Sequence, residues 1–193
     1  HLFDGMTAII EAFQNGTRYE IAMDQEDGLI SAGTPDVQLT WMDAKVDGWV
    51  VTPRNGKAVE VNALWYNALK IYAIFQEKFE GHSREVTALA RRVRASFHKV
   101  FWNERKNCLF DYIKTDGSAD LAFRPNQIFA VFLPFNVLDH AEEKAVVDAV
   151  FAKLYTSYGL RSLAPSDEHY EGFYGGDRVK RDGAYHQGTV WGF

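Results

Sequence analysis

The sequence predicts an all-helical domain whose loops gather at one end. Apolar residues recur at intervals of three or four in several segments, whereas strand signals are too few for a core sheet. Two long segments rich in glycine and aromatic residues separate the helices. Of the 193 residues, 47% are hydrophobic and 15% are aromatic, which is enough to build a packed core.

Five helices are predicted, and most have recognisable boundary residues. Asn15 and Gly16 stop the first helix, and Ser83 is placed to cap the third. Asp139 and Glu142 have the spacing of a capping box at the start of the last helix. The predicted helices cover residues 6–13, 58–80, 86–101, 125–134 and 139–154.

The segments between these helices are predicted to be ordered loops. Residues 17–57 form a connection far longer than usual, yet they contain Trp41 and Trp49, which a disordered linker would lack. We interpret them as an active-site loop with a short hairpin. Residues 109–113 predict a strand or an extended arm, and residues 160–187 a second glycine- and aromatic-rich loop.

Composition and motif spacing exclude several classes of function. The net charge of −5 argues against a nucleic-acid partner, and no apolar run is long enough to span a membrane. The single cysteine, Cys108, excludes an internal disulfide framework and fits a reducing, cytoplasmic setting. The six histidines form no metal-ligand pair, and no glycine-rich phosphate loop occurs. We therefore expect neither a metal nor a cofactor.

The first candidate site is the segment 38–54. Asp43 follows Trp41 closely, and partial desolvation of a carboxyl against an aromatic ring raises its pKa toward that of a general acid. Trp41 and Trp49 are also suited to stacking on a sugar ring. The structural alternative is that Asp43 pairs with Lys45 and that the tryptophans belong to the core.

Two further clusters offer polar groups for a ligand. Glu60 and Asn62 lie at the start of the second predicted helix, where Glu60 alternatively only complements the helix dipole. Residues 181–191 combine a carboxylate, a phenol, an imidazole, an amide and an indole, which together suit hydrogen bonding to a polyol. A purely structural histidine is the alternative there. These five side chains are Asp182, Tyr185, His186, Gln187 and Trp191.

Several blocks along the whole chain resemble the bacterial glycogen debranching enzymes of the amylo-alpha-1,6-glucosidase type. The blocks are DGLI (27–30), QLTWMDAK (38–45), VVTPR (50–54), VEVNALWYN (59–67), FRPNQ (123–127), GLRSLAP (159–165), YGGD (174–177) and DGAYHQGTVW (182–191). The resemblance implies an (α/α)6 toroid and inverting hydrolysis of alpha-1,6-linked glucose at glycogen branch points. The implied partner is an oligosaccharide or glycogen.

The resemblance also implies roles for individual residues. It assigns the general acid to Asp43, in the TWMDA block. Asp182 is the carboxylate that we name for the general base, although the base of this family is expected beyond residue 193. The expected substrate-binding residues are Trp41, Arg54, Glu60, Asn62, Arg124, Tyr185, His186, Gln187 and Trp191.

Helix count and family together predict one fragment, residues 1–193, of a toroid that is incomplete at both ends. Such a piece is expected to expose apolar surface, to self-associate and to be inactive alone. Two alternatives remain. One is a glucoamylase-like alpha-glucosidase on the same barrel, and the other is a helical module that binds carbohydrate without catalysis.

Overall fold

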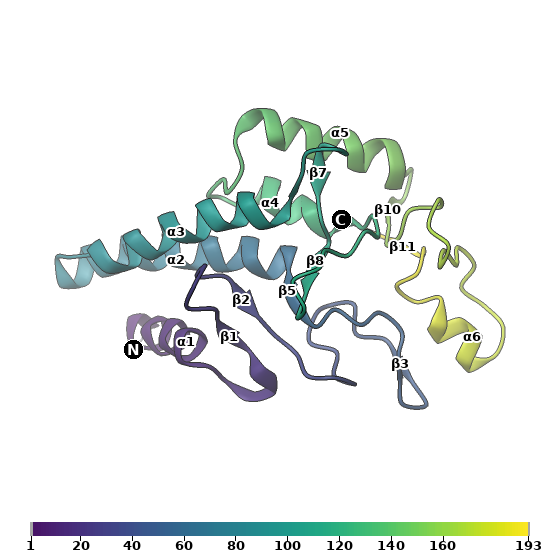
Figure 1. The fold of residues 1–193 in the computed structure, drawn as a ribbon, viewed down its shortest axis with the longest axis horizontal. Helices are drawn as coiled ribbons and strands as arrows, with labels where there is room; N and C mark the ends of the chain where they lie inside the picture. The colour runs from purple at the N-terminus through teal and green to yellow at the C-terminus, as the bar shows by residue number, and fades with distance from the viewer. Residues whose placement is uncertain (1, 193) are drawn as a thin grey trace.

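A hairpin of two long helices is the framework of the computed structural model, which describes residues 2–192. The hairpin consists of α2 (Val59–Glu80) and α3 (Arg84–Phe101), with α1 (Leu2–Asn15) on one side of it and α5 (His140–Leu154) on the other (Figure 1). The shorter helices in the described range are η1 (Arg18–Glu20), η2 (Pro125–Ile128), α4 (Phe129–Phe132) and α6 (Arg178–Gly183).

The boundaries of these helices follow local chemistry. At the start of α5, Asp139 accepts from the backbone N–H of Glu142 and the Glu142 side chain accepts from that of Asp139, which confirms the predicted capping box. Gly81 ends α2 in the left-handed conformation, with φ of 74°. Ser83 precedes α3, but its hydroxyl bonds to Glu77 rather than capping the helix.

The predicted apolar stripe of α3 is confirmed. Its buried side chains recur at helical spacing and face the core, while four of its arginines point outward. Two of these arginines also hold loops, because Arg94 donates to the carbonyls of Val137 and Leu138 and Arg92 donates to that of Gln25. The buried residues are Val86, Leu89, Ala90, Val93, Phe97 and Phe101.

The prediction of an all-helical fold is too simple, because the loops contain eleven short strands within residues 2–192. Each has two or three residues, too few for an alternating pattern to show in the sequence. The strands are β1 (Ala22–Met23), β2 (Ile30–Ser31), β3 (Lys45–Val46), β4 (Trp49–Val50), β5 (Gly56–Ala58), β6 (Trp102–Asn103), β7 (Cys108–Leu109), β8 (Tyr112–Lys114), β9 (Tyr155–Thr156), β10 (Gly159–Arg161) and β11 (Val190–Trp191).

All strand pairs are antiparallel, and they tie distant loops together. The pairs are β1–β2, β3–β4, β5–β8 and β6–β7, and β9, β10 and β11 form a three-stranded sheet. Gly56 of β5 approaches β8 so closely that a Cβ there would lie 2.0 Å from the carbonyl oxygen of Ile113, so only glycine fits.

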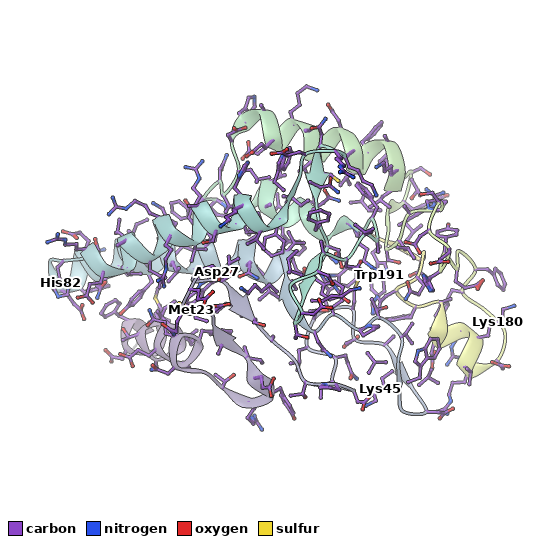
Figure 2. The ribbon with its side chains drawn as sticks, viewed as in Figure 1. Met23, Asp27, Lys45, His82, Lys180 and Trp191 are labelled. Carbon is purple, nitrogen blue, oxygen red and sulfur yellow. The ribbon has the colours of Figure 1, made fainter. Side chains whose placement is uncertain are left out.

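The loops gather at the end of the hairpin where α2 begins, as predicted. In Figure 1 the strands β5, β8, β10 and β11 and helix α6 lie on this side, opposite the turn that joins α2 to α3. Figure 2 shows the same polarity, with Trp191, Lys45 and Lys180 at the loop end and His82 at the opposite tip. Within residues 2–192, no helix is both long and apolar enough for a membrane span.

Candidate active site

A cluster of aromatic rings joins the first and third predicted clusters at the loop end. The Trp41 ring meets His186 and Trp191 edge-on, with ring centroids 5.1 and 5.5 Å apart. His186 stacks on Trp191 at 5.4 Å, and Tyr185 meets Trp191 edge-on at 5.1 Å. Two segments more than 140 residues apart in the sequence thus build one aromatic cluster, and its partly exposed rings, Trp41, Tyr185 and Trp191, form an aromatic surface.

Asp43 lies beside this surface, but the aromatic rings do not shield its carboxylate from solvent. Its Oδ1 is 3.6 Å from Nε2 of His186, too far for a good hydrogen bond, and 65% of its side chain is exposed. The expected desolvation of Asp43 against Trp41 is therefore wrong for this chain. The Trp41 indole turns toward the interior, where its Nε1 donates to Asn126 at 2.7 Å, and leaves the carboxylate open to solvent.

His186 is the most deeply buried member of the aromatic cluster. Its side chain is 1% exposed, and neither ring nitrogen has a hydrogen-bond partner in the described chain. Burial lowers the pKa of His186 to about 4, although the nearby Asp43 carboxylate opposes this shift. The imidazole is therefore neutral at pH 7, and Asp43 faces a dipole rather than a cation.

A buried ionic network lies beneath the surface and includes Arg54 and Glu60. The Arg54 guanidinium pairs with Glu60 through two hydrogen bonds, and its Nε donates to Asp111 Oδ2 at 2.7 Å. Burial opposes the charge of Arg54, but the two carboxylates together raise its pKa above the ordinary value. Arg54 and Glu60 thus satisfy one another, and their contact with a sugar stays a prediction.

Arg124 and Gln187 form a second network that joins three loops. Arg124 Nη1 donates to the backbone carbonyls of His186 at 2.7 Å and Ser162 at 3.1 Å, and its Nη2 donates to Gln187 Oε1 at 2.9 Å. Gln187 Nε2 in turn donates to the carbonyl of Val51 at 3.0 Å. Burial lowers the pKa of Arg124, while Asp111 beside it opposes the shift.

The side chains of two other predicted residues have partners within the chain. Asn62 is fully buried and bonds to both the N–H and the C=O of Ile30, so it fixes β2 to α2. Asp182 lies on α6 and pairs with Arg181 at 3.0 Å. The roles of both residues with substrate stay predictions. The side-chain amide of Asn62 already has its hydrogen-bond partners within the protein.

A cavity of about 1140 Å³ opens between the loops beside these networks. Of the predicted residues, Trp49, Arg54, Arg124 and Gln187 line it, whereas Asp43 does not. Asp120 and Tyr112 are also in its wall. Burial raises the pKa of Asp120, and burial together with nearby carboxylates raises the pKa of Tyr112 to about 12.

Sequence reasoning missed three residues of this region: Asp111, Asn126 and Asp120. A signal existed for Asp111, because it is a lone carboxylate within an apolar extended run and a buried carboxylate needs a cation. Asn126 lies in one of the blocks singled out in the sequence, next to the predicted Arg124. Asp120 follows a turn and carries no local signal.

The helical framework thus carries an aromatic surface and an exposed carboxylate at its loop end. In the comparison with protein families, the family model described as amylo-alpha-1,6-glucosidase matches residues 1–193. The chain belongs to this family.

Similar proteins support the same assignment. The glycogen debranching enzyme of Saccharomyces cerevisiae is 26% identical over 221 residues, which cover 91% of this chain. The chain spans only 14% of that protein's length.

Two solved structures share the fold. One is a neutral trehalase of Saccharomyces cerevisiae, with a TM-score of 0.52, 16% identity and coverage of 56% of this chain and 22% of the trehalase. The other is a GH78 family rhamnosidase of Bacillus sp. GL1, with a TM-score of 0.54, 19% identity and coverage of 77% of this chain and 14% of the rhamnosidase. The chain is thus structurally similar to six-hairpin glycosidases.

Proposed function

We propose that residues 1–193 carry the acid side of an inverting active site that hydrolyses alpha-1,6-linked glucose at glycogen branch points. In this proposal the chain is one part of an (α/α)6 toroid, and Asp43 is the general acid. The observation that carries it is the position of Asp43 beside His186, on a surface built by Trp41 and Trp191. Membership of the amylo-alpha-1,6-glucosidase family supports it.

The chemistry needs two carboxyl groups on opposite sides of the bond. A base takes a proton from water as the water attacks C1 of the glucose, and the bond between C1 and the leaving oxygen breaks. Asp43 gives its proton to that oxygen, which leaves as the 6-hydroxyl of the dextrin. The base and acid lie about 6.5–9.5 Å apart in inverting enzymes. We propose that the base comes from outside residues 1–193, with Asp182 as the alternative within them.

The exposure of Asp43 fits a site in which the acid and the base come from different parts of the protein. The Asp43 carboxylate approaches the His186 ring on one side and is otherwise open, which leaves space for a substrate and for a second group opposite. Substrate and the remainder of the site would then supply the desolvation that raises the pKa of a general acid.

The experiment is the Asp43→Asn variant of the full-length protein. We expect glucose release from a glucosyl-branched dextrin to fall by about 100- to 10,000-fold, the usual contribution of a general acid. Sugar binding by calorimetry stays near the wild-type value. The matched control is Asp47→Asn, since Asp47 is an exposed aspartate of the same loop that pairs with Arg178 on the surface. Ordinary turnover by Asp43→Asn would disprove the proposal.

The exposure of Asp43 also favours one second candidate, a module that binds carbohydrate without catalysis. In that case neither the wild type nor Asp43→Asn releases glucose, and both bind the dextrin. A glucoamylase-like alpha-glucosidase is separated by substrate, because it would release glucose from linear alpha-1,4 chains. The glucose first appears as the beta anomer in NMR spectra if the mechanism is inverting.

A further inference from the structure

Asn126 connects the two residues that precede Asp43 to the buried ionic network. Its side chain is fully buried, and its Oδ1 accepts from Nε1 of Trp41 at 2.7 Å. Its Nδ2 donates to Asp111 Oδ1 at 2.7 Å and lies 3.6 Å from the sulfur of Met42. Met42 is itself fully buried, so Asn126 contacts both neighbours on the N-terminal side of Asp43.

The orientation of the Asn126 amide is fixed by its two partners. An ionised carboxylate only accepts hydrogen bonds, and an indole N–H only donates them. The Asn126 NH2 group must therefore face Asp111, and its carbonyl must face Trp41. A flipped amide would lose both hydrogen bonds inside the protein, where an unpaired polar group costs about 1–3 kcal/mol.

Asp111 is held in place by charge. It is 3% exposed and lies between the guanidinium of Arg54, at 2.7 Å, and that of Arg124, whose Nε is 3.9 Å away. Arg54 is fixed in turn by Glu60, in the first turn of α2. A series of hydrogen bonds and ion pairs, buried except at Trp41, thus runs from the helix to the segment that presents Asp43.

We propose that Asn126 and Asp111 are positioning residues that act through Trp41 to set the direction in which Asp43 delivers its proton. This inference rests on the proposed function of Asp43. A displacement of about 1 Å at a reacting group is enough to lower a rate about 100-fold, so the orientation of the segment matters for proton transfer.

The test compares two substrates in the full-length protein. Hydrolysis of a glucosyl-branched dextrin needs a proton on the leaving oxygen, whereas the fluoride of alpha-glucosyl fluoride leaves without one. We expect Asn126→Leu, which keeps the volume and removes both hydrogen bonds, to lower kcat on the dextrin by about 10- to 100-fold. Its kcat on the fluoride stays within about threefold of wild type, an effect of less than 1 kcal/mol.

Two additional variants keep the test decisive. Asn126→Ala also removes both hydrogen bonds and adds no bulk, so it is expected to show the same selective loss if Asn126→Leu does not fold. Asn67→Leu is the matched control, because Asn67 is a buried asparagine in the middle of α2 whose amide bonds to the backbone of Phe135. We expect no change in the ratio of the two rates for Asn67→Leu.

The outcomes separate the two proposals. Equal losses on both substrates for Asn126→Leu and Asn126→Ala, or no loss, would overturn the positioning role while Asp43→Asn still shows the selective loss. If Asp43→Asn turns over the dextrin normally, the proposed function fails, and the positioning role fails with it.

Discussion

Arg54 and Asp43 lie eleven residues apart at the same end of the molecule, but their charged groups have opposite environments. Arg54 is buried and pairs with two carboxylates, whereas Asp43 is largely exposed and has no close hydrogen bond to His186. The buried layer is fully occupied by its own partners, and the surface layer is open. We therefore propose different roles for the two layers, in which the buried layer supports the site and the surface layer contacts a ligand.

This difference in burial separates the expected substrate-binding residues into two groups, which the sequence alone does not distinguish. Arg54, Glu60, Asn62 and Arg124 have their hydrogen-bonding groups satisfied inside the chain. The partly exposed rings of Trp41 and Trp191 form the surface, and the buried His186 ring contacts both of them and lies 3.6 Å from Asp43. A polar residue near a site is thus assigned to substrate only after its partners within the protein are known.

Breaking the buried layer has the largest expected effect. Arg54→Met leaves Glu60 and Asp111 buried without their cation, and loss of one partner of a buried ion pair costs about 3–5 kcal/mol of unfolding free energy. Urea unfolding measures it. The control is Arg178→Met, which removes an exposed partner of Asp47 and is expected to cost less than about 1 kcal/mol. Equal losses for the two variants would contradict the division into layers.

The second prediction concerns the pH dependence of stability at His186. Its folded pKa of about 4 lies below its ordinary value of 6.5, so protonation favours the unfolded chain. The stabilisation is complete above pH 6.5 and is lost as the pH falls toward 4, by at most about 3 kcal/mol. His186→Phe is expected to remove this part of the decline in thermal unfolding experiments. An unchanged pH profile would show that the imidazole is not buried in the neutral form.

Asp120 gives a smaller effect of opposite sign. Burial raises its pKa, so its contribution to stability is present below the ordinary carboxyl pKa of 3.8 and is lost as the pH rises through the folded value. Asp120→Asn is therefore expected to gain stability relative to wild type as the pH rises from 4 to 7. Melting temperatures of the two proteins across this range measure the difference. A constant difference would contradict the burial of Asp120 in the cavity wall.

The smallest effect is expected when charged residues are introduced at exposed apolar positions of the helical framework. Leu64, Ile71 and Ile74 of α2 are exposed and share one face of the helix. We expect a polypeptide of residues 1–193 to self-associate through this stripe, and Ile71→Glu with Ile74→Glu to shift it toward the monomer in sedimentation experiments. Val179→Glu on α6 is the control at an exposed apolar position elsewhere. Monomeric wild type would contradict the expectation.

The sequence predicted what depends on local spacing. The α3 stripe, the capping box of Asp139 and the stop at Gly81 each involve residues within a few positions of one another. The aromatic surface was predicted through the resemblance, which joined Trp41 to the segment 182–191. Local rules were sufficient for the framework.

What the sequence did not predict depends on long-range partners. Arg54 and Asp111 are 57 residues apart, and Trp41 and Asn126 are 85 apart, so no local pattern records either bond. The expected desolvation of Asp43 failed for the same reason, because the partner of the Trp41 indole turned out to be a buried asparagine. Asp120 has the desolvation that we expected for Asp43.

The most direct test of the central claim therefore compares these two carboxyl groups as acids. Asp43→Asn and Asp120→Asn are assayed in the full-length protein on the branched dextrin and on alpha-glucosyl fluoride. The account predicts that only Asp43→Asn loses the dextrin reaction selectively, by about 100-fold or more, while both variants keep the fluoride reaction. A selective loss in Asp120→Asn with normal turnover by Asp43→Asn would contradict it.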